Sequence, residues 1–313
     1  MKSMDTWLSR LMMSIAGMVL LMTGLMVNSA KGQFLMMPDS TNNRLVLFDP
    51  FNGSVVNSNF FGLQAGTPIR ALQVGNQIWV SEQVGDRISR WDFNGNHLGN
   101  IGGQFAGGGL DNIRGMELIN NTIYVTNAGT LNNAPGAAVV MFDTNGNNLG
   151  FFNAAGLAPS PFSVIEHQGG LLVASSSAND DIHRFDLVGS SLGTFHNSAT
   201  LNFAHQLIIA ANGDVLAAGF SSNNVVRMDP NTGATISTFT AGGARGVYQL
   251  GNGNILWTSG TGAHVYDVNL GTSSQVYVGD GRHVGFVTIP EPAAGLLLSS
   301  LGLGLTLLRR RRS

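Results

Sequence analysis

The chain of 313 residues contains no cysteine, 42 glycines and only 11% charged residues. Without cysteine it forms no disulfide bonds, so its fold must be stabilised by packing and by backbone hydrogen bonds. Residues 33–290 hold nine arginines, no lysine and sixteen acidic residues, a formal charge of −7. This balance argues against nucleic acid as a partner, because binding to phosphates needs a broad basic surface.

The first 30 residues have the layout of a secretory signal peptide. Lys2 and Arg10 come before an apolar run over residues 11–27, and small or polar residues then lead to Ala30. This order predicts export and cleavage near residue 30. The alternative is a permanent N-terminal membrane anchor, because Asn28 is an unfavourable residue so close to that cleavage site.

The body that follows repeats a short pattern in which an aromatic or methionine residue precedes an aspartate. The six copies are Phe48 with Asp49, Trp91 with Asp92, Phe142 with Asp143, Phe185 with Asp186, Met228 with Asp229 and Tyr266 with Asp267. Each copy closes a short strand-like run and is followed three or four residues later by glycine, which predicts a tight turn. We expect these aspartates to accept backbone N–H bonds in the turns and to be structural.

Three further strand patterns accompany each copy, so that four strands recur about every ~43 residues, the spacing of a β-propeller blade. The 258 residues from 33 to 290 are long enough for six such units. No segment of the body has a sustained helical period. The sequence therefore predicts an all-β fold, a six-bladed β-propeller over residues 33–289.

The two ends of this propeller complement each other. The first copy begins at "QFLMMPDS" and lacks a first strand, whereas an extra strand pattern, "GRHVGFVTIP", follows the last copy at residues 281–290. We predict that the N- and C-terminal strands pair in one sheet, which closes the ring without an open edge at the junction.

The repeat resembles the NHL repeat and its six-bladed relatives, most clearly in "IRALQVGNQIWVSEQVGDRISRWDFNGNHLGNIGG" at residues 69–103. The third copy departs from the pattern through the insertion "GTLNNAPG". The resemblance implies a binding platform, since most propellers of this type bind other molecules, although some relatives are hydrolases or lyases. Fold alone does not decide between these activities.

Few motifs in the body indicate catalysis. The glycine-rich stretch at residues 102–109 lacks the Lys-Ser/Thr ending of a phosphate-binding loop, so we interpret it as a connection between blades. The seven histidines show no zinc-binding spacing, and no Gly-x-Ser-x-Gly motif occurs. We therefore predict no catalytic residue, no metal site and no cofactor.

One set of residues does suggest a ligand site. The start of the first strand in successive blades carries Arg70, Arg114, Phe162, His205, Arg245 and Arg282. If this strand is the innermost, these side chains surround the propeller axis, where the cations repel one another unless an anion compensates them. The hypothesis is a ligand-binding ring of Arg70, Arg114, His205, Arg245 and Arg282. The alternative is pairing with neighbouring acids such as Glu82 or Glu117.

The end of the chain combines three features. Pro290, Glu291 and Pro292 are followed by an apolar stretch at residues 293–308 and then by four arginines, which are Arg309, Arg310, Arg311 and Arg312. As a helix the apolar stretch would be about 24 Å long, short of the ~30 Å hydrocarbon layer of a bilayer. We expect a short transmembrane helix that makes a minimal span, with the arginines on the cytoplasmic side.

These residues, 290–313, resemble the PEP-CTERM sorting signal of Gram-negative bacteria that make extracellular polysaccharide. The resemblance implies recognition and processing by an exosortase-type enzyme, transient association with the inner membrane, and a final location at the cell surface or in the extracellular matrix. It implies nothing about the activity of the propeller.

From these observations we predict an exported protein whose NHL-like propeller is a non-catalytic binding module for an anionic polysaccharide or another surface partner. The alternative is a hydrolase of the lactonase type, with a metal near the central channel. A third interpretation, a purely architectural matrix component, predicts no saturable ligand.

Overall fold

The structure, a computed structural model, describes residues 31–102, 109–177 and 182–290. The predicted signal peptide, most of the glycine-rich stretch and the predicted tail after Pro290 lie outside these residues. In the described ranges no helix is long and apolar enough to cross a membrane. The compact body of the chain is Gln33–Val287.

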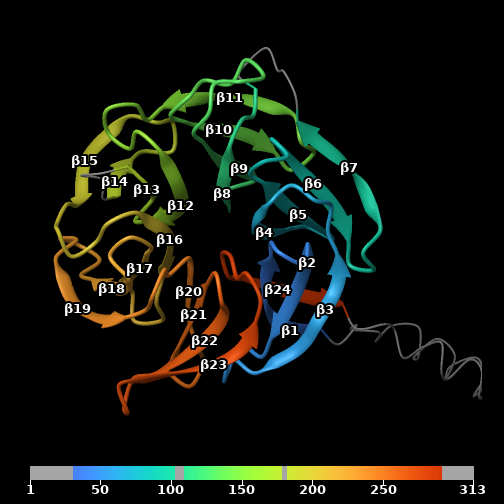
Figure 1. The fold of residues 1–313 in the computed structure, drawn as a ribbon. Helices are drawn as coiled ribbons and strands as arrows, with labels where there is room; N and C mark the ends of the chain where they lie inside the picture. The colour runs from blue at the N-terminus through green and yellow to red at the C-terminus, as the bar shows by residue number, and fades with distance from the viewer. Residues whose placement is uncertain (1–30, 103–108, 178–181, 291–313) are drawn as a thin grey trace, which may run out of the picture. The chain divides into compact units, whose positions relative to one another are not determined.

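The described residues form six sheets of four strands each, which surround a common axis (Figure 1). Blade 1 has the order β24 (Gly285–Pro290), β1 (Lys31–Asp39), β2 (Arg44–Phe48) and β3 (Val55–Gly62). Blade 2 is β4 (Pro68–Val74), β5 (Gln77–Glu82), β6 (Arg87–Asp92) and β7 (His97–Gly102). Blade 3 is β8 (Ile113–Ile119), β9 (Thr122–Asn127), β10 (Ala138–Asp143) and β11 (Asn148–Asn153).

The other three blades continue the same order. Blade 4 is β12 (Pro161–His167), β13 (Gly170–Ser175), β14 (Ile182–Phe185) and β15 (Ser191–His196). Blade 5 is β16 (Ala204–Ile209), β17 (Val215–Gly219), β18 (Asn224–Met228) and β19 (Thr235–Thr240). Blade 6 is β20 (Gly246–Gln249), β21 (Ile255–Ser259), β22 (Gly262–Asp267) and β23 (Thr272–Val278). The first strand of each blade is nearest the axis (Figure 1).

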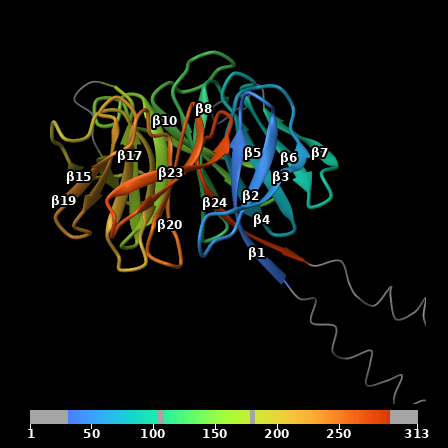
Figure 2. The same ribbon diagram turned by 60° about the horizontal axis from the view of Figure 1, so that its bottom comes forward.

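Two predictions about the architecture are confirmed. The fold is an all-β propeller of six blades, and β24 lies beside β1 in the first sheet, so the two ends of the described propeller complete one blade (Figure 2).

The turn aspartates are structural, as Asp143 illustrates: its carboxylate accepts N–H bonds from Asn145 at 2.9 Å and from Asn147 at 2.8 Å. Bonds from Asn147 hold the pKa of Asp143 below its ordinary value. Equivalent turn bonds form at Asp49, Asp92, Asp186, Asp229 and Asp267.

The hydrophobic core lies between adjacent blades. One cluster joins blades 2 and 3 through Trp79, Ile88, Met116 and Phe142, all fully or almost fully buried. Similar clusters join blades 4 and 5 and blades 6 and 1. Each sheet packs both of its faces against neighbouring blades, so its central strands carry apolar side chains on both faces.

The third and fourth strands of all six blades pair with a register irregularity. In three blades the fourth strand carries a glycine in the left-handed region, which is Gly99 in β7, Gly150 in β11 and Gly193 in β15. These bulges bend the outermost strands, because an extra residue increases the local twist.

The first and second strands also pair irregularly in blades 2 to 5, beside the predicted ring residues. The irregularities fall at Pro68/Arg70, Ile113/Met116, Pro161/Ser163 and Ala204/Leu207. A bulge leaves backbone groups without partners in the sheet and turns a side chain in a new direction. Here it turns the ring residues away from the regular alternation of the strand.

Backbone N–H and C=O groups near these bulges form hydrogen bonds with the neighbouring blade. Together these hydrogen bonds surround the axis, and we call them the axial belt. Its bonds are Ser81 Oγ to Arg114 O, Thr126 Oγ1 to Phe162 O, Leu207 N to Ser163 Oγ, Val247 N to Gln206 Oε1, Thr258 Oγ1 to Arg282 O, and His283 N to Ile69 O. Each pair of adjacent blades is therefore linked near the axis.

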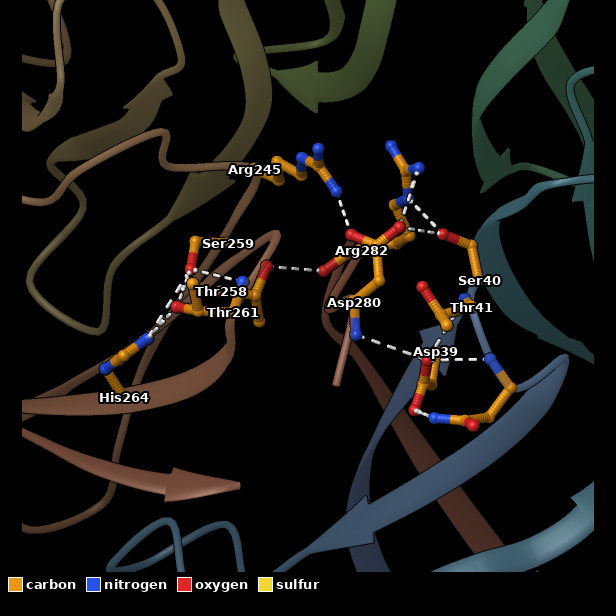
Figure 3. A network of polar contacts seen from close by, with 11 residues as sticks. Asp39, Ser40, Thr41, Arg245, Thr258, Ser259, Thr261, His264, Asp280 and Arg282 are labelled. Carbon is orange, nitrogen blue, oxygen red and sulfur yellow. Dashed lines mark hydrogen bonds and ion pairs between the residues drawn. The ribbon is translucent and has the colours of Figure 1, made fainter. Parts of the chain in front are cut away.

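A second set of polar contacts joins blade 6 to blade 1 around the buried carboxylate of Asp39. Tyr277, on β23, donates its hydroxyl to Asp39 Oδ2 at 2.5 Å, and the backbone N–H of Asp280 donates to Asp39 Oδ1 at 3.2 Å (Figure 3 shows the second contact). Burial raises the pKa of Asp39, but hydrogen bonds from Asn42 and Tyr277 outweigh burial and leave the pKa below its ordinary value. Burial and the bond to Asp39 raise the pKa of Tyr277 to about 12.

We predict that Asp39→Asn destabilises the protein at pH 7 by about 1–3 kcal/mol, because an amide nitrogen replaces an acceptor among buried donors. The folded-state pKa is depressed, so the carboxylate's contribution is complete above the unfolded-state pKa of about 4 and is lost as pH falls through the lower folded value. Urea unfolding between pH 3 and 7 measures this. Asp267→Asn is the control, since asparagine also suits an exposed turn. Equal stability of wild type and Asp39→Asn at pH 7 would show that the Asp39 carboxylate does not stabilise the junction of blades 6 and 1.

Candidate functional site

The predicted ring residues divide into two groups. Arg70 lies in β4, Arg114 in β8 and His205 in β16, whereas Arg245 directly precedes β20 and Arg282 comes three residues before β24. Burial lowers the pKa of His205 far below its ordinary value, and so do the nearby charges of Arg282, Arg245 and Arg114. Arg114 and Arg245 also lie against the rings of Phe162 and Phe220, whose centres are 3.8 Å and 5.9 Å from that of His205. Besides burial, Arg70 and Arg282 both lower the pKa of the neighbouring His283.

Arg70 is held by the scaffold. Its Nη1 donates to the carbonyl of Val284 at 2.6 Å, and its Nη2 lies 3.6 Å from Glu117 Oε2. This ion pair is one of the two that the alternative interpretation named. The other acid named there, Glu82, pairs with Arg87 at 2.6 Å. Arg70 is therefore bound by Val284 and Glu117 and does not share the carboxylate that Arg245 and Arg282 contact.

Arg245 and Arg282 share one carboxylate. Both guanidinium groups contact Asp280, and Arg282 Nη2 lies 3.1 Å from Asp280 Oδ2 (Figure 3). Arg282 Nε also donates to Ser40 Oγ at 2.7 Å, and Ser40 donates to Asp280 at 2.5 Å. Burial and the charge of Arg245 lower the pKa of Arg282 to about 10, although Asp280 opposes this. Arg282 therefore remains cationic at pH 7.

Arg114 is buried, with 8% of its surface exposed, and is held by neutral groups. Its Nη1 donates to Ser160 Oγ at 2.9 Å and to Ser176 Oγ at 3.1 Å, and its guanidinium lies 4.5 Å from the centre of the Phe162 ring. Across residues 31–102, 109–177 and 182–290, no carboxylate forms an ion pair with it. Burial lowers the pKa of Arg114 to about 10, so it also remains charged at pH 7.

Two buried histidines lie beside these arginines. His205 Nδ1 and His283 Nε2 are 3.0 Å apart, so one ring donates a hydrogen bond to the other. Burial lowers the pKa of each histidine far below its ordinary value, and nearby arginines lower it further. Both rings are therefore neutral at pH 7, and they add no positive charge to the site.

Aromatic rings connect the arginines. Phe162 lies 3.8 Å from His205 and 5.3 Å from Phe203, measured between ring centres. Phe203 lies 5.1 Å from Phe220, and the guanidinium of Arg245 is 5.6 Å from the Phe220 ring centre. We call this set the basic-aromatic cluster. Its members are Arg114, Phe162, Phe203, His205, Phe220, Arg245 and Arg282.

The sequence prediction missed Phe203, Phe220 and Asp280, all of which lie outside the strands. A weak signal existed for Phe203, because it stands two residues before His205 in the chain. None existed for Phe220, which directly follows β17, or for Asp280, which reaches two arginines of different blades. Loop residues of this kind cannot be placed by strand periodicity.

The cluster can bind anions and offers little to a metal ion. It presents three guanidinium groups against the single carboxylate of Asp280. In the part of the chain that the structure describes, no group of three or more histidine, aspartate or glutamate side chains could hold a metal ion. A small cavity of about 10 Å³ is lined in part by Arg70, Glu117, Gln206 and His283.

The fold and this cluster define a six-bladed β-propeller with a cationic, aromatic cluster near its axis. Solved structures with a similar fold include a chain of a nidogen–laminin complex, with a TM-score of 0.66, 13% identity, and coverage of 82% of this chain and 98% of that one. A protein of unknown function from Bacteroides caccae has a TM-score of 0.60, 14% identity, and coverage of 82% and 98%.

A streptogramin B lyase is also similar, with a TM-score of 0.54, 13% identity, and coverage of 77% of this chain and 86% of the lyase. No family model and no curated protein matches the sequence. At these identities the likeness shows the propeller fold alone, because the same fold carries both enzymes and binding proteins.

We predict that Asp280→Asn lowers stability by about 1–3 kcal/mol, because it leaves two partly buried arginines without a counter-charge. Added sulfate should then raise the melting temperature more in the variant than in wild type, since sulfate can replace the lost carboxylate. Asp214→Asn, which breaks the ion pair with Arg227 on β18, is the control for general effects of sulfate. An equal sulfate response in all three proteins would show that the two arginines do not accept an external anion.

Proposed function

We propose that this protein is an exported, non-catalytic binding module and that its basic-aromatic cluster binds an anionic partner, such as an acidic polysaccharide or an acidic surface protein. The observation that carries the proposal is the burial of Arg114 among neutral groups. A buried charge without a counter-ion is unfavourable, and the hydrogen bonds that Arg114 donates to two serines compensate it only in part.

The neighbours of Arg114 support an anion as the ligand. Arg245 and Arg282 share one carboxylate between them, and the two histidines at the site are neutral. A carboxylate or sulfate group would therefore gain charge-assisted hydrogen bonds from guanidinium groups that are already positioned. The site would also attract anions although the propeller as a whole is acidic, because nearby charges dominate at short range.

The alternative function is a hydrolase of the lactonase type with a metal near the axis. Two described acids of this region, Glu117 and Asp280, are engaged by Arg70 and by Arg245 with Arg282. The two functions differ in a simple measurement, because a metal bound in the native site raises the melting temperature. A saturable rise with calcium would favour the hydrolase.

We predict that Arg114→Gln weakens binding to dextran sulfate by about 10- to 100-fold, the effect of losing one charge-assisted hydrogen bond, and that it reduces the dependence of binding on salt. Uncharged dextran should not bind. Arg90→Gln, on β6 in the third strand of blade 2, removes the same charge away from the cluster and should bind like wild type. The proposal fails if wild type does not bind dextran sulfate at low salt, or if the two variants lose affinity equally.

We also propose that residues 1–30 and the tail beginning at Pro290 act as a signal peptide and a PEP-CTERM sorting signal. The order of features in these segments supports this proposal. The partner would be an exosortase-type enzyme, and the product would reside at the cell surface or in the matrix after transient association with the inner membrane.

Mature protein recovered from the native host should then lack both the first ~30 residues and the arginines at the end of the tail. Intact mass spectrometry measures this directly. Surface protein that still carries Arg309, Arg310, Arg311 and Arg312 would contradict the processing proposal and would leave the binding proposal untouched.

A further inference from the structure

Phe203 has a backbone conformation that is unusual for its type. It precedes β16 with a φ of 56°, in the left-handed region, where a side chain with a Cβ comes close to the adjacent carbonyl oxygen. Most of the other non-glycine residues with positive φ in the described ranges are asparagines, which tolerate this region well. A large aromatic residue in this conformation is a reason to look for a function.

The conformation sets Phe203 against Phe220. The backbone N–H of Phe220 donates to the carbonyl of Phe203 at 2.9 Å, and the two ring centres are 5.1 Å apart. Phe203 also stacks on His205, with 15° between the ring planes. Both phenylalanines are partly exposed, whereas Phe162 beside them is buried. The strained residue therefore helps to form a shelf of two accessible aromatic rings, Phe203 and Phe220.

This aromatic shelf lies between two cations. On one side Phe203 contacts Phe162, which contacts Arg114. On the other side Phe220 contacts Arg245. A guanidinium group therefore stands at each end of this series of contacts. Asn202 and Ser221, both exposed, flank the two shelf residues in the chain and are joined by a backbone hydrogen bond of 3.1 Å. Their amide and hydroxyl groups add hydrogen-bonding capacity at the edge of the shelf.

We infer that the site binds a chain of uronic acid sugars, with carboxylates at Arg114 and Arg245 and the apolar faces of sugar rings on Phe203 and Phe220. The inference rests on the proposed function and names its ligand class. A uronic acid sugar combines what the site offers: a carboxylate for a guanidinium group, C–H groups for an aromatic ring, and hydroxyls for polar groups at the edge. A small anion such as sulfate would use the arginines and leave the shelf unused.

Four probes, used in binding experiments with the full chain, separate the contribution of the ligand's charges from that of its sugar rings. An oligogalacturonate carries rings and carboxylates, its methyl ester keeps the rings but loses the charges, sulfate keeps only charge, and benzoate is a carboxylate with an aromatic ring. We expect the oligogalacturonate to bind at least about tenfold more tightly than each of the others, since it alone uses both arginines and the shelf. Equal binding of the methyl ester, or tighter binding of benzoate, would overturn the inference.

Phe203→Asn tests the shelf without disturbing the backbone, because asparagine is well suited to the left-handed conformation. The variant should be as stable as wild type or more so, should lose about tenfold in affinity for oligogalacturonate, and should keep its response to sulfate. Phe51→Asn is the matched control: Phe51 is exposed in the turn after β2, and its replacement should leave binding unchanged. Phe220→Ala, at the other ring of the shelf, should reproduce the loss.

The outcomes distinguish this inference from the proposed function. If Phe203→Asn and Phe220→Ala both bind oligogalacturonate like wild type while Arg114→Gln does not, anion binding stands and the uronic acid inference is wrong. If wild type binds neither dextran sulfate nor oligogalacturonate, both are wrong. A selective loss of oligogalacturonate binding in the two phenylalanine variants supports the inference.

Discussion

The axial belt of hydrogen bonds is the constraint on which the rest of the structure depends. The blades pack through apolar faces, and apolar contact is non-directional, so it does not by itself fix how far each sheet is rotated about its neighbour. The belt supplies that direction, because hydrogen bonds such as those of Thr126 and Gln206 require defined geometry. It also satisfies backbone groups that the bulges of the inner strands remove from the sheets.

The same belt explains why the basic-aromatic cluster exists where it does. Arg114 and His205 lie within the bulged parts of inner strands, and the carbonyl of Arg114 is itself an acceptor in the belt. The backbone is thus fixed at the point from which the Arg114 side chain extends. A rigid backbone lowers the entropy lost when such side chains order around a ligand. Scaffold and site are parts of one arrangement.

Much of the fold could be predicted from the sequence because its signals are local. The alternating strands, the glycine after each turn aspartate and the strand at residues 281–290 all follow from short-range chemistry, and so does the closure of the ring. The alternative to a ligand-binding ring, pairing of the arginines with nearby acids, named Glu117, and Arg70 does pair with it. The direction of the Arg70 and Arg114 side chains could not be predicted, because both residues lie at bulges and periodicity assumes regular alternation. The positions of Phe220 and Asp280 depend on loops and on contacts between blades, for which no local pattern exists, and Phe203 had only its closeness to His205 in the chain as a signal.

The bulges of the outermost strands affect how this protein can meet other molecules. In the described blades, each fourth strand has a neighbour on one side only, and its pairing is interrupted in every blade. A straight free edge would accept a further strand from any extended peptide, including a second copy of the chain. Six bent edges make a poor template for such addition. The rim of the described blades therefore disfavours the addition of a further strand, whether from a peptide or from a second copy of the chain.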